Sequence, residues 1–558
     1  MSGASLRRRA GGPRAARSPI WLTLAACLWI ASAGNLALWQ QLQRLQLLQG
    51  WRGAGFAIGL GLGMVALLAL LLALLSWRTT LKPALSALLL ATAFGAHFML
   101  SYGVVIDSTM ITNALQTDWR ETRDLLSLRL LFTVLLLGGL PLWLVWRTPL
   151  AWPRWPAQLR RNALLLLAAL ALLVAAAGAI FQPLAANSRN HKQLRYLVNP
   201  LNALVALGQL AAQPWQHKGP RVLLTLGEDA QLATSAVTGT APPRPALLLL
   251  VLGETARSDH FALNGYARPT TPELATLGVT SQRNAWSCGT STAASVPCMF
   301  SHLGREAYGQ RQQDYETLVD VLQRAGLAVL WLDNQAGCKG VCDRVPNVST
   351  SALSHATLCP DGECLDEILL DGLEARIAAL PAERRARGVV LLMHQMGSHG
   401  PAYARRSPAA AKRFMPECQS AALQDCSRDE VVNAYDNSIA YTDHFLAGAV
   451  RWLQAHSAAS DTALLYVSDH GESLGENNLY LHGLPYAIAP DVQKHVPWIS
   501  WFSPGYLQRS GLQPACLQQR LDERVSHDQY FHSVLGLTGV RTRAYRPEWD
   551  FYRPCRQP

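Results

Sequence analysis

Five apolar segments constrain the fold of this chain more than any other feature. Each is nearly free of charged residues and reaches the roughly 20 residues that a helix needs to cross a bilayer core. Tryptophans cluster near their ends, as they do at the two interfaces of a membrane. The segments cover residues 19–39, 55–76, 83–106, 125–146 and 162–186. The sequence therefore predicts a multi-pass α-helical membrane domain with five spans.

Basic residues in the short loops predict the orientation of these spans. They concentrate in the leader, in the loop around Arg78 and Lys82, and in the loop from Arg147 to Arg161. Because loops rich in lysine and arginine stay in the cytoplasm, we expect the amino terminus there and the rest of the chain outside. The alternative, a signal peptide cut near residues 31–33, leaves this destination unchanged because four spans remain.

The cysteines fit an oxidising compartment. Cys27 lies in the first span, and the other ten of the eleven cysteines follow residue 287. An even set in an extracytoplasmic domain is typical of disulfides. Zinc ligation by "CKGVC" and "CPDGEC" is the alternative, which an oxidising compartment disfavours. Four predicted pairs are close in sequence and the fifth follows by elimination: Cys288/Cys298, Cys338/Cys342, Cys359/Cys364, Cys418/Cys426 and Cys516/Cys555.

The part of the chain beyond residue 245 has the pattern of an α/β domain. Short aliphatic runs alternate with helical patterns at 315–325 and 429–456, which favours a buried, largely parallel sheet. The predicted strands are 246–253, 327–333, 388–394, 463–469 and 496–502.

Four parts follow from these patterns. They are an Arg-rich cytoplasmic leader (1–18), a five-helix transmembrane domain (19–187), membrane-surface bridging helices with a linker (188–244), and an α/β domain outside the cytoplasm (245–558). The net charge of +11 does not indicate nucleic acid binding, because much of the excess lies in the leader and cytoplasmic loops.

Polar residues follow the ends of four predicted strands, where ligands bind in open α/β sheets. Carboxylate and imidazole groups suit zinc, and three protein ligands that leave a fourth position open are typical of a catalytic site. Glu254, Asp469 and His470 are the predicted three. The polar residues at the strand ends are Glu254, Asn334, His394, His399, Asp469 and His470.

The loop "SCGTSTAASVPC" (287–298) offers a nucleophile for such a site. A threonine hydroxyl is a poor nucleophile at neutral pH and requires an adjacent base or a metal ion. The small neighbouring side chains would admit a bulky phosphodiester. Spacing alone does not choose between Thr290 and Thr292.

Six motifs, together with five spans and the segment "IDSTMITNALQTDWRETRDLL", resemble the phosphoethanolamine transferases that modify lipid A. This family includes the mobile colistin-resistance enzymes and has the fold of the alkaline phosphatase and sulfatase superfamily. The motifs are "GETARSDHFALNGYARPTTPEL", "SCGTSTAASVPCMFS", "DNQAGCKGVCDRV", "HQMGSHGPAY", "AYDNSIAYTDHF" and "YVSDHGESLGENNLYLHG".

The resemblance implies that residues 245–558 form a periplasmic catalytic α/β domain of the alkaline-phosphatase/sulfatase type, and it implies roles for individual residues. Thr292 would be the nucleophile, and one firmly bound zinc ion would be held by Glu254, Thr292, Asp469 and His470. Lys339, His399 and His482 match positions that handle the transferred group or a second zinc ion. Asn113, Thr117 and Glu121 match residues that help to hold the ethanolamine head group. His394 and His495 are weaker candidates. Two departures from the colistin-resistance enzymes are Gln335, where they have asparagine, and the cysteine pair of "CKGVC".

The implied reaction transfers phosphoethanolamine from phosphatidylethanolamine to a lipid A phosphate or a related envelope saccharide, through a phosphothreonine ester. We expect a monomer in the bacterial inner membrane that contacts membrane lipid and no nucleic acid. The nearest rival function is that of a sulfatase or phosphodiesterase-type hydrolase of the same superfamily. A glycerol-phosphate polymerase of this fold, or an inactive sensor or scaffold, fits the motifs less well.

Overall fold

A computed structural model describes residues 16–117, 119–216, 222–233, 244–350, 353, 355–359 and 362–557. Residues 1–15 of the predicted leader, and residues 217–221 and 234–243 of the predicted linker, lie outside the described residues. The chain forms two compact units. One comprises Met1–Leu100 and Leu128–Val205, and the other comprises Ser101–Ser127 and Ala206–Pro558.

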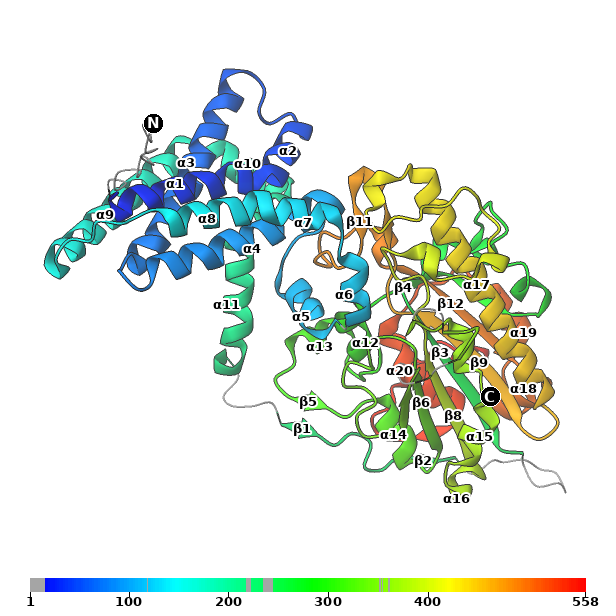
Figure 1. Ribbon diagram of the computed structural model, residues 1–558. Helices are drawn as coiled ribbons and strands as arrows, with labels where there is room; N and C mark the ends of the chain where they lie inside the picture. The colour runs from blue at the N-terminus through cyan, green and yellow to red at the C-terminus, as the bar shows by residue number, and fades with distance from the viewer. Residues whose placement is uncertain are drawn as a thin grey trace, which may run out of the picture. The chain divides into compact units, whose positions relative to one another are not determined.

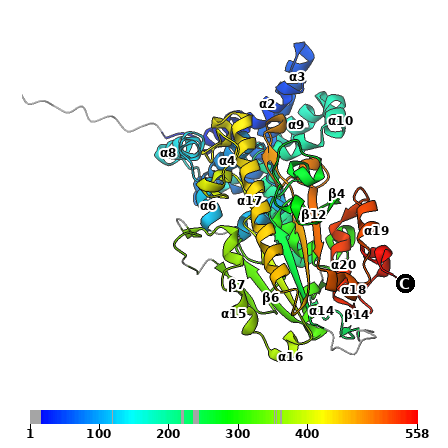
Figure 2. The same ribbon diagram turned by 90° about the vertical axis from the view of Figure 1, so that its right-hand side faces the viewer.

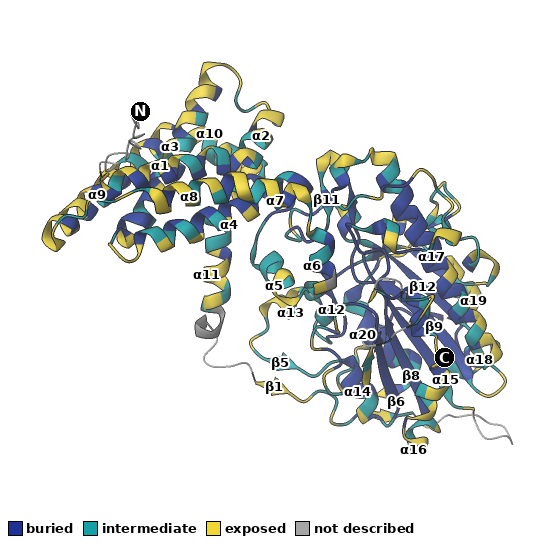
Figure 3. Ribbon diagram, viewed as in Figure 1, coloured by how far each residue is buried: buried dark blue, intermediate teal, exposed yellow. Residues whose placement is uncertain are grey.

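The first unit contains five helical segments that are long and apolar enough to cross a membrane (Figure 1). Many of their large apolar side chains are exposed, as contact with lipid requires (Figure 3). The five predicted spans are therefore confirmed. The segments are Pro19–Arg44 (with α1, Pro19–Ala31, and α2, Leu36–Arg44), α3 (Gly50–Leu75), α4 (Leu81–Tyr102), Leu128–Arg147 (with α7, Leu128–Val134, and α8, Leu140–Arg147) and α9 (Trp155–Ala179).

Two buried asparagines stabilise a break in the first span between α1 and α2. Asn35 Nδ2 donates hydrogen bonds to the carbonyls of Ile30 and Asn199. Asn199 Nδ2 in turn donates to the carbonyls of Gly34 and Thr92. These bonds matter because a backbone carbonyl left unpaired inside a bilayer is costly. Beyond the fifth span the chain continues through α10 (Phe181–Asn190) and α11 (Leu201–Gln216).

The second unit is built on a mixed eight-stranded sheet of order β13-β4-β12-β9-β3-β8-β6-β7. Strands β9, β3, β8, β6 and β7 are parallel, which confirms the α/β class. The strands are β3 (Ala246–Gly253), β4 (Thr280–Trp286), β6 (Ala328–Asp333), β7 (Asn347–Ser349), β8 (Gly388–His394), β9 (Asp461–Ser468), β12 (His495–Phe502) and β13 (Val525–Ser526).

Two features of the sheet differ from the sequence-based expectation. The predicted strand at 496–502 runs antiparallel to both of its neighbours, β9 and β4. Strand β4 was not predicted, because its sequence "TSQRNAW" is mostly polar and lacks an aliphatic run. A buried apolar run predicts a strand but carries no information about its direction.

Helices cover both faces of the sheet (Figure 2). Helix α17 (Arg428–Ala455) lies on one face, and its amino end has a capping box formed by Ser427 and Glu430. Helices α18 (Pro504–Ser510) and α20 (Tyr530–Thr538) lie on the other face. The side chains of β3 that point toward α20 join a continuous buried cluster with Val534 and Leu535. The strands are consequently the most buried part of this unit (Figure 3).

The loop between the third and fourth spans belongs to this second unit. It contains α5 (Ser108–Gln116) and α6 (Trp119–Leu125). Buried Asp124 forms ion pairs with Arg405 at 2.8 Å and with Arg406 at 2.9 Å. Arg123 pairs with Glu363 at 2.9 Å. These contacts hold the loop against the α/β domain.

All ten cysteines beyond residue 287 are joined in disulfides, and the free cysteine Cys27 is buried in the first span. Because Cys338 and Cys342 are bonded to each other, "CKGVC" has no thiolates to offer a metal ion. The five pairs are Cys288–Cys298, Cys338–Cys342, Cys359–Cys364, Cys418–Cys426 and Cys516–Cys555.

Candidate active site

The strand register brings the polar residues at the strand ends together. Gly253 at the end of β3 pairs with Ser468 at the end of β9, and Leu252 pairs with His394 on the opposite side. Glu254 and Asp469 therefore leave neighbouring strands at the same height. Because the three strands are parallel, their carboxyl ends form one edge of the sheet.

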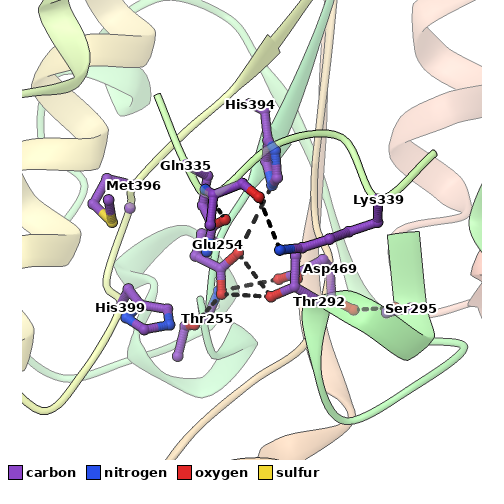
Figure 4. Close-up of polar contacts among 12 residues, drawn as sticks. Glu254, Thr255, Thr292, Ser295, Gln335, Lys339, His394, Met396, His399 and Asp469 are labelled. Atoms are coloured by element: carbon purple, nitrogen blue, oxygen red, sulfur yellow. Dashed lines mark hydrogen bonds and ion pairs between the residues drawn. The ribbon is translucent and has the colours of Figure 1, made fainter. Parts of the chain in front are cut away.

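The side chain of Thr292 points toward Glu254 at this edge (Figure 4). Its Oγ1 lies 3.2 and 3.1 Å from the two carboxylate oxygens of Glu254 and 3.4 Å from Nε2 of His470. Thr290, in contrast, donates its hydroxyl hydrogen bond to the carbonyl of Leu484 at 2.6 Å. Thr292 is thus the threonine of this loop whose hydroxyl faces the two strand ends.

Local structure holds Thr292 in this position. It is the first residue of α12 (Thr292–Met299), so its oxygen lies at the positive end of a helix dipole. The Cys288–Cys298 disulfide closes the loop around the start of the helix. One turn on, Ser295 donates a hydrogen bond to the carbonyl of Asp469 at 2.5 Å, which ties α12 to the end of β9.

Glu254, Asp469 and His470 form a buried donor set suited to a metal ion. All three are fully buried, and their ligand atoms lie within 4.8 Å of one another. Oδ1 of Asp469 accepts hydrogen bonds from the backbone N–H groups of Thr255 and His470. Oδ2 of Asp469 is buried without a hydrogen-bond partner among the described residues. It lies 3.3 Å from Nε2 of His470. A buried carboxylate oxygen that accepts no hydrogen bond is costly, and a metal ion bound by both groups would stabilise it.

The electrostatics of the site favour positive charge next to its two carboxylates. Burial and the neighbouring charge of Glu254 raise the pKa of Asp469 to about 7. Although burial opposes it, the carboxylates of Asp469 and Glu254 raise the pKa of His470 to about 10. Burial would raise the pKa of Glu254, yet hydrogen bonds from His394 and His470 hold it well below its ordinary value. Two carboxylates and an imidazole in this arrangement fit zinc.

His394 supports Glu254 from behind. Its Nε2 lies 3.8 Å from Oε2 of Glu254, and its Nδ1 lies 3.0 Å from Oδ2 of Asp333 at the end of β6. Asp333 was missed by sequence reasoning, although it is the last residue of a predicted strand and so carried the same signal as Glu254. The Asp333–His394 pair fixes the orientation of the ring next to the donor set.

The backbone after Glu254 is strained, and α17 holds it in place. Thr255 has a φ of +59°, which β-branched residues rarely adopt. The hydroxyl of Tyr435 in α17 donates a hydrogen bond to the carbonyl of Thr255 at 2.8 Å. It also accepts one from the N–H of Arg257 at 2.9 Å. Such over-determined strain is common at functional sites.

Two predicted histidines extend the site away from Thr292. The ring of His482 lies 4.2 Å from that of His470, and the ring of His399 lies 5.6 Å from that of His482. Burial and the charge of His470 lower the pKa of His482 to about 3, so this ring is neutral. His399 Nε2 then lies 3.9 Å from a carboxylate oxygen of Glu121.

Glu121 is held by Gln335, the residue that replaces the asparagine of the colistin-resistance enzymes. Gln335 Nε2 donates a hydrogen bond of 2.9 Å to Oε1 of Glu121, and both side chains are buried. From the sequence, Gln335 was identified only as a departure from the asparagine of those enzymes. The structure gives this side chain a different task, because it orients the predicted head-group carboxylate.

The other predicted residues are less tightly connected to the site. Lys339 has a φ of +51°, and its ammonium donates to the carbonyls of Gln116 and Ala336. Asn113 and Thr117 lie on and just after α5, which packs against α12, and the Thr117 hydroxyl donates to the carbonyl of Asn113. His495 lies at the start of β12, stacked on Trp286, and its ring contacts the carbonyl of Arg283.

Comparison with protein families defines the class of this architecture. The family model described as Sulfatase matches residues 246–540. The family model described as phosphoethanolamine transferase EptA/EptB matches residues 64–214. Together with the buried donor set beside a helix-initiating threonine, these matches define a sulfatase-like enzyme joined to a membrane domain.

Comparison with individual proteins places the chain in one family. It is 39% identical over 543 residues to phosphoethanolamine transferase EptA of Salmonella typhimurium, covering 96% of this chain and 97% of the relative. It is 37% identical over 546 residues to phosphatidylethanolamine transferase Mcr-1 of Escherichia coli, covering 96% and 98%. The chain belongs to the EptA/Mcr family of phosphoethanolamine transferases.

A solved structure agrees over the full length. The integral membrane lipooligosaccharide phosphoethanolamine transferase A from Neisseria meningitidis superposes with a TM-score of 0.90 at 32% identity, covering 96% of this chain and 99% of that chain. The chain is therefore an integral membrane protein with its α/β domain in the periplasm.

We expect a methyl group at Gly397 to damage the site. Gly397 has a φ of +52°, and a Cβ built there would lie 2.6 Å from the carbonyl oxygen of Glu254. Gly397→Ala should therefore displace Glu254 and lower the rate of phosphoethanolamine transfer by at least about tenfold, because small misplacements at a reacting centre are costly. Transfer rate and thermal unfolding of the purified protein measure the effect.

Gly372→Ala is the matched control for that substitution. Gly372 also has a positive φ, of +61°, but a Cβ there meets nothing within 4 Å. It should cost about 1 kcal/mol of stability from backbone strain alone and leave the transfer rate unchanged. Equal rates in the two variants would contradict the role given to Gly397.

Proposed function

We propose that this enzyme takes phosphoethanolamine from phosphatidylethanolamine, holds it as an ester on Thr292, and passes it to a phosphate of lipid A or a related envelope saccharide. The observation that carries the proposal is the contact of Thr292 Oγ1 with Glu254 and His470, at 3.1 and 3.4 Å, two members of the donor set that Asp469 completes. A hydroxyl aimed into an acidic donor set is suited to activation as a nucleophile.

The two half-reactions balance as two displacements at phosphorus. In the first, the oxygen of Thr292 forms a bond to the phosphorus of the donor, and the bond from phosphorus to the glycerol oxygen breaks. Diacylglycerol leaves with the proton that Thr292 gives up. In the second, a phosphate oxygen of the acceptor bonds to phosphorus and the bond to Thr292 breaks. The threonine oxygen takes up the proton of the acceptor's hydroxyl, or one from solvent if that oxygen is ionised, and its hydroxyl is restored.

The residues of this chain divide the work between them. Glu254, Asp469 and His470, with Thr292, would hold one zinc ion. When bound, zinc supplies positive charge that favours deprotonation of a hydroxyl and offsets charge on phosphoryl oxygens. Glu254 and His470 hold the Thr292 oxygen at the donor set, and the Asp333–His394 pair keeps Glu254 in place. Burial excludes water that would compete for the ester.

The donor and acceptor classes are supported by the relatives and by the membrane spans. Mcr-1 is described as a phosphatidylethanolamine transferase, and the Neisseria meningitidis enzyme as a lipooligosaccharide transferase. Both lipids have apolar tails that remain in the bilayer. Because five spans fix the enzyme in the same membrane, they raise the local concentration of both lipids and restrict their orientation.

Glu121 is suited to bind the ammonium group of the donor. It is a buried carboxylate oriented by Gln335, and it is connected to Thr292 through His399, His482 and His470. We expect Glu121→Gln to lower kcat/KM for phosphatidylethanolamine by about 10- to 100-fold, since a hydrogen bond to a charged group is worth about 1.5–3 kcal/mol. Release of diacylglycerol at varied donor concentrations measures the effect.

Glu383→Gln is a control for that change, because Glu383 is an exposed carboxylate on α16 (Ala382–Arg385). It should leave kcat/KM within about twofold of the unmodified enzyme, as surface substitutions usually do. A Glu121→Gln variant with unchanged kcat/KM would remove the head-group assignment.

The deciding experiment follows both products of the reaction. The full chain is expressed in a Gram-negative strain that lacks other phosphoethanolamine transferases, and lipid A is analysed by mass spectrometry. Transfer predicts lipid A that carries added phosphoethanolamine and a matching release of diacylglycerol. Release of diacylglycerol with free phosphoethanolamine and unmodified lipid A would instead identify a hydrolase.

A further inference from the structure

A cavity in the first unit combines apolar walls with two arginines. It has a volume of about 650 Å³ and lies among α1, α4 and α8. Leu22, Ala26 and Leu89 form part of its apolar wall, and Arg17 and Arg147 lie among its lining residues. Arg17 precedes the first span and Arg147 is the last residue of the fourth, so both lie on the cytoplasmic side.

Backbone hydrogen bonds hold the lining of this cavity together near its two arginines. The N–H of Arg17 donates to the carbonyl of Pro149 at 2.9 Å, and the carbonyl of Arg17 accepts from the N–H of Ala151 at 2.9 Å. These two bonds join the start of the first span to the loop after the fourth. The Arg17 guanidinium lies 4.0 Å from the ring centre of Trp21, and that of Arg147 lies 4.7 Å from the ring centre of Trp143. Each guanidinium is thus held against an interfacial tryptophan.

A proline distorts the fourth span where this span lines the cavity. Pro141 in α8 lacks the N–H that would bond to the carbonyl of Leu137, and the helix passes through a π-helical segment, η2 (Leu135–Gly139). The indole of Trp29, which also lines the cavity, donates a hydrogen bond to that carbonyl at 3.1 Å. The local distortion of the fourth span is therefore stabilised by α1.

The net charge of the first unit indicates that the ligand of this cavity is an anion. The sequence contains no aspartate or glutamate in residues 1–100 or 128–205, the two segments that form the unit. Among the residues that the structure describes, neither Arg17 nor Arg147 has an ion pair. Their counter-charges must come from outside the unit. At the cytoplasmic surface of a membrane, phosphate groups of anionic lipids supply such charges.

We propose that this cavity binds an anionic phospholipid of the inner leaflet, with its phosphate between Arg17 and Arg147 and its acyl chains along the apolar wall. Phosphatidylethanolamine fits less well, because its ammonium group would find no carboxylate in this unit. Free phosphate would leave the apolar wall unused. The site is separate from the catalytic centre and does not depend on the proposed reaction.

Native mass spectrometry of the full-length protein in detergent tests this site. After delipidation, the protein is titrated with phosphatidylglycerol or with phosphatidylethanolamine. We expect one phosphatidylglycerol to bind tightly, and the Arg17→Gln/Arg147→Gln double variant to bind it about tenfold or more weakly, because each arginine interacts with the lipid phosphate. Phosphatidylethanolamine should bind more weakly than phosphatidylglycerol to the unmodified protein.

A matched double variant distinguishes binding at this cavity from general electrostatic attraction of anionic lipid to the protein. Arg160 and Arg161 are exposed at the start of α9, on the same side of the membrane, and neither lines the cavity. Arg160→Gln/Arg161→Gln removes the same charge and should retain phosphatidylglycerol. Equal loss in both double variants, equal binding of the two lipids, or full displacement of phosphatidylglycerol by inorganic phosphate would each overturn the proposal.

A third variant guards against misfolding of the arginine variant. Ala25 lines the cavity, and Ala25→Trp would obstruct part of it while leaving both arginines in place. This variant should also bind phosphatidylglycerol more weakly while its thermal unfolding stays cooperative. Unchanged affinity for phosphatidylglycerol in this variant would contradict the proposed position of the acyl chains.

Discussion

Replacing Thr292 with alanine is expected to lower phosphoethanolamine transfer by at least about 10³-fold, the order of loss seen when a nucleophile is removed from other covalent enzymes. The substitution removes the Oγ1 atom that contacts Glu254 and His470. Both half-reactions then lose the group that carries the transferred phosphoryl unit. The lipid A mass spectrum and the rate of diacylglycerol release measure the loss.

Two variants of the same loop make this result specific. Ser291 lies next to Thr292, and its buried hydroxyl has no hydrogen-bond partner among the described residues. Ser291→Ala should therefore retain transfer within about threefold, as substitutions that remove no contact usually do. Thr292→Ser keeps an oxygen at the reacting position and should retain part of the activity. Unchanged transfer in the alanine variant of Thr292 would show that another group accepts the phosphoryl unit.

A direct readout of the covalent step complements the rates. When the enzyme is supplied with donor and no acceptor, the phosphoethanolamine ester should accumulate. Thr290 and Thr292 lie on the same peptide. Fragmentation of that peptide in the mass spectrometer should place the added mass on Thr292 and not on Thr290. Thr290 is an unsuitable acceptor because its hydroxyl is bonded to the carbonyl of Leu484.

Much of the catalytic domain was predictable because its central strands are buried on both faces. Aliphatic runs such as "ALLLLVLG" and "ALLYVSD" correspond to β3 and β9 within two residues. The carboxyl ends of parallel strands meet at one edge, so the sequence alone predicted that Glu254 and Asp469 lie near each other. Functional residues at strand ends can thus be predicted from a sequence when the strands can be predicted.

Other features depend on contacts between distant parts of the chain, which spacing does not reveal. Thr290 and Thr292 are equivalent in sequence, and only their partners, Leu484 and Glu254, distinguish them. The sequence pattern placed the loop after the third span within the membrane domain. Its grouping with the α/β domain follows from ion pairs such as Asp124–Arg406, which join residues 282 positions apart.

Replacing Asp469 with asparagine is expected to weaken zinc binding and transfer together. Asparagine has the same shape but lacks the charge of a carboxylate whose Oδ2 has no hydrogen-bond partner among the described residues. Since even residues that only orient metal ligands cost about 10- to 100-fold in affinity when mutated, loss of a ligand charge should cost at least about 10²-fold. Metal analysis after dialysis against a chelator, and transfer with and without added zinc, measure the two effects.

Stability without metal gives an independent readout of the same variant. In the metal-free protein burial and the charge of Glu254 raise the pKa of Asp469 to about 7, so the two carboxylates destabilise each other. Asp469→Asn should therefore unfold at the same or a higher temperature than the unmodified protein when both lack metal, and should gain less stability from zinc. Asp522→Asn, at an exposed ion pair with Arg283, should change neither property. If the Asp469 variant kept full zinc affinity, the metal site would have to be built from other residues, whereas loss of zinc with full transfer would separate the metal from the reaction.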